Sequence, residues 1–109
     1  MDKPKTKFIY GLKNFKKRIN RRIKVDKMLL FGSRARGNYK EDSDFDIIVV
    51  SDKFKRMKWE EREFILYPYW DFNELEQGFD FLCYTPKEFE KMKNKICIVR
   101  VANKEGINI

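Results

Sequence analysis

The sequence contains no histidine among its 109 residues, and this absence excludes several kinds of catalytic site at once. A Ser-His-Asp triad, a Cys-His pair, a histidine-bound zinc ion and imidazole acid–base catalysis all require that side chain. If the chain is an enzyme, carboxylates and metal ions must therefore carry its chemistry.

Cysteines and long apolar runs are also scarce. Cys83 and Cys97 have apolar neighbours in the sequence and no CxxC spacing, so we expect buried free thiols and a reducing compartment. No apolar run approaches the roughly 20 residues that cross a bilayer, and the lysine-rich start lacks the apolar region of a signal peptide. We expect a soluble cytoplasmic protein with one domain, residues 1–109, that needs no disulfide.

Positive charge is abundant and unevenly distributed. The formal net charge is +8, and residues 1–27 hold 11 Lys/Arg against 2 Asp/Glu, whereas the remainder holds 14 against 15. A solvated helix surface is the simplest interpretation of this excess. Contact with nucleic acid or with an acidic protein surface is the alternative.

Apolar spacing predicts helices at both ends of the chain. A basic helix is expected over about 8–24, because apolar residues recur there at intervals of three or four. The catalytic core is expected to occupy the rest of the chain, about 25–109. Thr85 and Pro86 suit the cap and first turn of a helix over 86–95. In 96–105 β-branched residues favour a strand, whereas the length and a Gly106 C-cap favour a helix, which we prefer.

Three apolar runs predict buried strands over 25–31, 45–50 and 79–84. Between the second and third strands, residues 58–66 show an imperfect helical stripe that Pro68 should end. The aromatic stretch 67–72 that follows is either core packing, the simpler interpretation, or an interface.

Two carboxylates stand at the start of the second predicted strand. Because side chains alternate along a strand, Asp44 and Asp46 project from one side, about 6 to 7 Å apart. Such a pair is best maintained by a hard cation such as Mg²⁺. If the first two strands are antiparallel neighbours, Gly32 and Ser33 lie beside this pair, with backbone N–H groups that favour phosphate.

Other interpretations of this region fail at definite positions. Gly32 and Gly37 have the glycine spacing of a Walker A loop, but Asn38 and Tyr39 replace its Lys and Ser/Thr. An EF-hand loop beginning at Asp42 would have Ile47 where glycine is required. A GxSxG nucleophile elbow is absent. A purely structural turn and strand end would explain either half alone, but explains the combination poorly.

The stretch GSRARGNYKEDSDFDIIVV, residues 32–50, resembles the signature of the minimal nucleotidyltransferases, small members of the DNA polymerase β superfamily. Their pattern is roughly G-S-x-A-R-G, a short spacer, and S-D-x-D before apolar residues. The resemblance extends from about residue 25 to the end. It implies an α/β (α+β) nucleotidyltransferase fold, a small mixed sheet flanked by helices.

The resemblance also implies a reaction and a set of site residues. A nucleoside monophosphate passes from a nucleotide, ATP here, to a hydroxyl with two Mg²⁺ ions, held by Asp44, Asp46 and a third carboxylate. Asp80 at the start of the third predicted strand is the candidate for that carboxylate. Gly32, Ser33 and Arg36, and less clearly Arg34, are the expected nucleotide-binding residues.

The sequence alone does not decide which molecule accepts the nucleotide. Minimal nucleotidyltransferases often pair with small helical HEPN proteins and act as antitoxins that attach AMP to a tyrosine of the partner, which is the acceptor we expect. Transfer to a small molecule or an RNA end is the alternative, with phosphate contacts from basic residues of 13–24. A module that masks its partner without catalysis is a third possibility.

Overall fold

The computed structural model describes residues 6–95 and 97–109. In this part of the chain four strands form one mixed sheet in the order β3-β2-β1-β4. β1 (Lys27–Phe31) pairs antiparallel with β2 (Phe45–Val50) and β4 (Ile107–Asn108), whereas β2 and β3 (Phe79–Tyr84) run parallel. The predicted α+β class and mixed sheet are confirmed.

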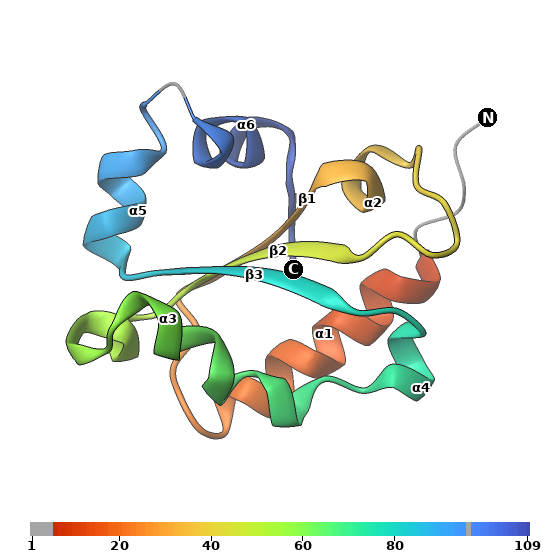
Figure 1. The fold of residues 1–109 in the computed structure, drawn as a ribbon, viewed down its shortest axis with the longest axis horizontal. Helices are drawn as coiled ribbons and strands as arrows, with labels where there is room; N and C mark the ends of the chain where they lie inside the picture. The colour runs from red at the N-terminus through yellow and green to blue at the C-terminus, as the bar shows by residue number, and fades with distance from the viewer. Residues whose placement is uncertain (1–5, 96) are drawn as a thin grey trace.

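Helices cover both faces of this sheet (Figure 1). On one face lie α1 (Thr6–Asn20), α3 (Trp59–Arg62) and α4 (Phe72–Leu75). On the other lie α2 (Gly32–Arg36), α5 (Pro86–Met92) and α6 (Ile98–Glu105). No helix in the described ranges is long and apolar enough to cross a membrane.

The two layers divide the core between alternate residues of the strands. Met28 and Leu30 pack in the cluster on the α1 side, whereas Leu29 and Phe31 pack in the cluster beneath α5 and α6. Neighbouring strand residues point to opposite faces, so the central strands are buried on both sides. This is why they read as continuous apolar runs.

The predicted strands 45–50 and 79–84 are confirmed at their bounds, and the first begins two residues late, at Lys27. β4 was not predicted, because two residues carry no periodic signal. The predicted helix over 8–24 is α1, which ends at Asn20. The Asn20 side chain accepts a hydrogen bond from the Val25 backbone N–H at 2.9 Å, so it stabilises the turn into β1.

The predicted helix over 58–66 is confirmed in part: α3 leads directly into the 3-10 helix η2 (Glu63–Ile65), so the helical segment covers 59–65. Other short turns flank it, η1 (Asp52–Arg56) before it and η3 (Tyr67–Tyr69) and α4 after it. Pro68 does not end helical structure, because it lies in the first turn of η3, where a missing N–H is tolerated.

The C-terminal predictions hold better. α5 begins at Pro86 with a capping box between Thr85 and Glu88, and ends at Met92, earlier than predicted. The preferred helix in 96–105 is confirmed as α6, which ends at Glu105 with Gly106 as its C-cap; residue 96 lies outside the described residues. Neither cysteine forms a disulfide: Cys83 is buried as predicted, but Cys97 is only half-buried.

Candidate active site

The sheet brings the predicted carboxylates to one edge. Asp46, near the start of β2, lies opposite Asp80 of the parallel strand β3 and opposite Phe31 of β1. Phe31 directly precedes Gly32, so the glycine-serine corner and Asp80 flank Asp46 from its two sides. Asp44 lies just before β2, where Phe45 donates its N–H to the carbonyl of Gly78.

The carboxylates influence one another electrostatically. Burial raises the pKa of Asp46 above its ordinary value, the negative charges of Asp80 and then Asp44 raise it further, and Arg36 partly opposes them. Ionised oxygens that repel one another in a partly desolvated position are the donors that a hard cation stabilises.

Mg²⁺ fits this donor chemistry, because all three side chains offer hard oxygen ligands. In the described part of the chain, however, no three Asp, Glu, Cys or His side chains are gathered closely enough to hold a metal ion as they stand. For Asp44, Asp46 and Asp80 to bind one metal ion together, their side chains would therefore have to rotate.

Gly32 lets the backbone approach Asp46 closely. Its φ is +72°, a left-handed conformation that favours glycine, and a Cβ atom at this position would collide with the Asp46 carboxylate. Ser33 lies in the first turn of α2. Gly78 makes a similar approach, since a Cβ atom there would lie 3.1 Å from Oδ1 of Asp44.

A pocket of about 400 Å³ joins four of the predicted site residues: Gly32, Arg36, Asp46 and Asp80. Ser33 and Asp44 do not line it. Its remaining wall is mainly apolar and comes from β1, α2, β3 and α6: Phe31, Ala35, Leu82, Ile98, Val101, Ala102 and Glu105.

The α6 wall was missed by sequence reasoning. Ile98 and Val101 are 57% and 49% exposed, although both are apolar. Nothing in the local sequence distinguishes them from core residues, and only the docking of α6 beside β1 and α2 places them at the pocket. Exposed apolar side chains next to carboxylates form the kind of mixed wall that small-molecule sites use.

Arg34 has a different role from the nucleotide contact expected for it. Its side chain is buried, and the guanidinium donates hydrogen bonds to the carbonyls of Ser43 (2.8 and 3.1 Å) and Glu41 (3.2 Å). It also lies over the rings of Tyr39, at 4.2 Å, and Phe45, at 4.5 Å. Arg34 therefore neither binds phosphate at the pocket nor points into solvent; it fixes the loop that leads into Asp44.

Fold and site together define a nucleotidyltransferase. A model of the nucleotidyltransferase domain family matches residues 12–105, and the chain belongs to this family. This confirms the resemblance seen in residues 32–50.

Two relatives are proteins of Methanocaldococcus jannaschii. "Putative protein adenylyltransferase MJ0141" is 41% identical over 49 residues, which cover 43% of this chain and 50% of that protein. "Putative protein adenylyltransferase MJ0604" is 55% identical over 31 residues, 28% of this chain and 31% of that protein. The matches thus span half or less of these relatives.

The fold is shared with a "putative nucleotidyltransferase" from Sulfolobus solfataricus, known from a crystal structure. The TM-score is 0.56 with 22% sequence identity, over 99% of this chain and 89% of that one. At this identity the likeness shows the fold alone.

Proposed function

We propose that this nucleotidyltransferase is a Mg²⁺-dependent adenylyltransferase that transfers AMP from ATP to a hydroxyl group, the preferred acceptor being a tyrosine of a HEPN-type partner protein. The observation that supports it most is the pocket that joins Gly32, Arg36, Asp46 and Asp80 to an apolar wall. The names of the two archaeal relatives, each a "putative protein adenylyltransferase", favour a protein acceptor.

In the proposed mechanism Asp44, Asp46 and Asp80 would hold the metal. Mg²⁺ bound there would supply charge stabilisation for the attacking and the leaving oxygen of an in-line displacement. The acceptor oxygen bonds to the α-phosphorus, the bond from that phosphorus to the bridging oxygen breaks, and pyrophosphate leaves. Asp80 accepts the proton of the acceptor hydroxyl.

The nucleotide would be bound by the remaining walls of the pocket. The backbone N–H groups at Gly32 and Ser33 and the Arg36 guanidinium bind the triphosphate, whose charge they complement. Ile98 and Val101 of α6 offer an apolar surface on which the base can pack.

A protein acceptor is favoured over RNA by an aromatic surface at the same edge of the sheet as Asp80, on the opposite face. Phe64, Tyr67 and Phe72 are 57%, 37% and 61% exposed, and they form one cluster with Phe79, the residue before Asp80. Burial raises the pKa of Tyr67, a hydrogen bond to Glu63 and the charge of Glu63 raise it further, and the charge of Asp80 makes a smaller contribution. Exposed aromatic clusters of this kind are typical of protein interfaces.

The charge of residues 59–80 also favours a protein acceptor over RNA. Residues 59–80 contain seven Asp/Glu, no lysine and one arginine, Arg62, which is buried and paired with Glu88. An acidic surface repels the phosphates of an RNA end, whereas it complements a basic protein. The exposed part of the aromatic stretch 67–72 is thus proposed to contact the partner, while Trp70 packs in the core.

The test uses α-labelled ATP, Mg²⁺ and a HEPN-type protein from the same genome, with intact mass as the readout. The wild type should add one or more AMP units to the partner, and Asp46→Asn should add none. Asp42→Asn, which removes the same charge from an exposed loop residue four positions away, is the matched control and should remain active.

The same experiment separates the alternatives. Label on RNA or on a small molecule, with no mass gain on the protein, would favour the second acceptor class. A masking module would neutralise its partner equally well as the Asp46→Asn variant, and that result would reject catalysis as the function.

A further inference from the structure

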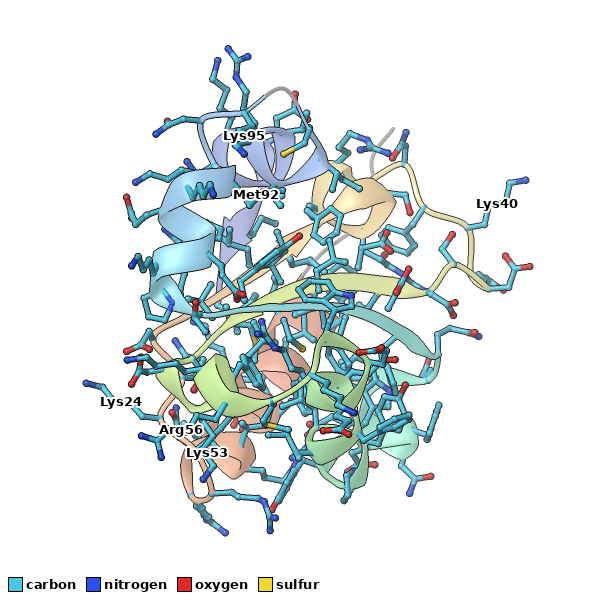
Figure 2. The ribbon with its side chains drawn as sticks, turned by 60° about the vertical axis from the view of Figure 1, so that its left-hand side comes forward. Lys24, Lys40, Lys53, Arg56, Met92 and Lys95 are labelled. Atoms are coloured by element: carbon cyan, nitrogen blue, oxygen red, sulfur yellow. The ribbon has the colours of Figure 1, made fainter. Side chains whose placement is uncertain are left out.

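A groove of about 670 Å³ lies at the end of the sheet away from the carboxylates. Its residues come from two segments, the connection before β1 and the chain that leaves β2. They are Arg22, Ile23 and Lys24 from the first, and Ser51, Asp52, Lys53, Lys55, Arg56 and Met57 from the second. Figure 2 shows Lys24, Lys53 and Arg56 together at one corner of the molecule, away from Lys40.

The two walls of this groove are held together by direct contacts. The buried Ser51 hydroxyl donates a hydrogen bond to the Lys24 carbonyl at 2.6 Å. A carboxylate oxygen of Asp26 accepts the Asp52 N–H at 3.2 Å, and the Asp26 N–H binds the Val50 carbonyl at 2.8 Å. The cationic side chains therefore extend from a fixed backbone rather than from two independent loops.

The cations of the groove are largely uncompensated. Its five Lys/Arg side chains are all exposed. Lys24 lies 4.0 Å from Asp26, at the limit of an ion pair, and Arg22, Lys53, Lys55 and Arg56 form no ion pair with any residue in 6–95 or 97–109. The groove also contains the exposed Asp52, so its lining carries five positive charges against one negative charge. Concave surfaces with a strong excess of one sign of charge concentrate counter-charged ligands.

We infer that this groove binds the phosphodiester backbone of single-stranded nucleic acid. An acidic protein fits it less well, because protein interfaces are centred on exposed aromatic or apolar anchors. Here Ile23 is buried and Met57 is half-buried. A single strand can enter a concave groove, whereas a duplex presents its phosphates on a convex surface.

The site is separate from the site of transfer. The carboxylate Asp46 and the groove residue Ser51 are joined by the extended strand β2, which places them about 16 Å apart at about 3.3 Å per residue. The basic helix α1 is a poorer candidate than the groove. The Lys16 ammonium donates a hydrogen bond to the carbonyl of Ile109, and the Arg18 guanidinium donates one to the carbonyl of Tyr69, so both cations already have partners within the chain.

The test measures fluorescence anisotropy of a labelled 12-nucleotide single-stranded RNA of mixed sequence. With five phosphate contacts and a slope of about −0.7 per contact, affinity should fall about 100-fold between 50 and 200 mM salt. The variant Lys53→Gln/Lys55→Gln/Arg56→Gln leaves two contacts, so its affinity should fall only about 7-fold over the same range. Its binding at 50 mM salt should be at least ~10-fold weaker than that of the wild type.

The control variant Lys13→Gln/Lys17→Gln/Lys40→Gln removes the same charge from exposed residues outside the groove, and should bind RNA like the wild type. Equal losses in the two triple variants would overturn the inference, because net charge alone would explain binding. An acidic poly-glutamate peptide that binds as tightly as RNA would also overturn it. Asp46→Asn should bind RNA normally, so failure of the proposed transfer reaction leaves this test unaffected.

Discussion

Replacing Gly32 by alanine separates the backbone requirement of the glycine-serine corner from its contact with the metal-binding carboxylate. The left-handed φ of +72° costs a residue with a Cβ atom about 1–2 kcal/mol. For a chain of this size that penalty lowers the melting temperature by roughly 4–15 °C. The new Cβ atom also collides with the Asp46 carboxylate and must displace it.

Gly37→Ala is the matched control. Gly37 has a φ of +88°, so the substitution carries the same backbone penalty, but it lies at the C-cap of α2 and does not line the pocket. Both variants should lose similar stability. Only Gly32→Ala should lose AMP transfer, by about 100-fold, because a displacement of about 1 Å in a catalytic group has effects of that order.

The assay compares thermal unfolding with transfer from α-labelled ATP, measured well below both melting temperatures. If the two alanine variants lose activity equally while folded, the contact between Gly32 and Asp46 has no special role in transfer. If Gly32→Ala melts like the wild type, the left-handed geometry assigned to this residue is wrong.

Three further predictions concern titration and reactivity. Because burial and two neighbouring aspartates raise the pKa of Asp46, its ionised form opposes folding; Asp46→Asn should raise the melting temperature of metal-free protein at pH 7, a difference that vanishes below the ordinary pKa of 3.8. Burial raises the pKa of Cys83 to about 12, so a thiol reagent at pH 8 should label Cys97 in the native protein and both cysteines after unfolding; rapid native labelling of Cys83 would contradict its burial. The hydrogen bond from Arg62 lowers the pKa of Glu88, so the stability that wild type has over Glu88→Gln should be present at pH 7 and disappear as the pH falls through the lowered pKa; an advantage that persists in acid would reject this.

Local signals account for the elements that were predicted correctly. β2 and β3 are short β-branched or aromatic runs bounded by turn residues, and α5 begins with a capping residue, a proline and a glutamate in the right order. The same rules did not predict the short turns of segment 51–76. Its buried residues Phe54, Leu66 and Trp70 reach the core from short successive turns, which produce no sustained period.

Arg34 and Arg36 illustrate the limit of the motif itself. Both lie in α2, two residues apart, and the sequence offers the same charge at each. Packing separates them: Arg34 is enclosed by Tyr39, Phe45 and the carbonyls of the following loop, whereas Arg36 is exposed at the rim of the pocket. A helix of 3.6 residues per turn directs such side chains about 200° apart, and only the neighbours decide which direction is buried.

The sequence by itself determined the family, the order of the glycine-serine corner before the paired aspartates, and the exclusion of histidine chemistry. The absence of histidine is a property of composition. The family and the order of the motif are read from residues close together in the sequence. The tertiary structure alone decided that Asp80 stands opposite Asp46, that α6 lines the pocket, and that cations from two distant segments share one groove. Strand register and helix docking depend on burying apolar surface across the whole chain, and no short stretch of sequence contains that information.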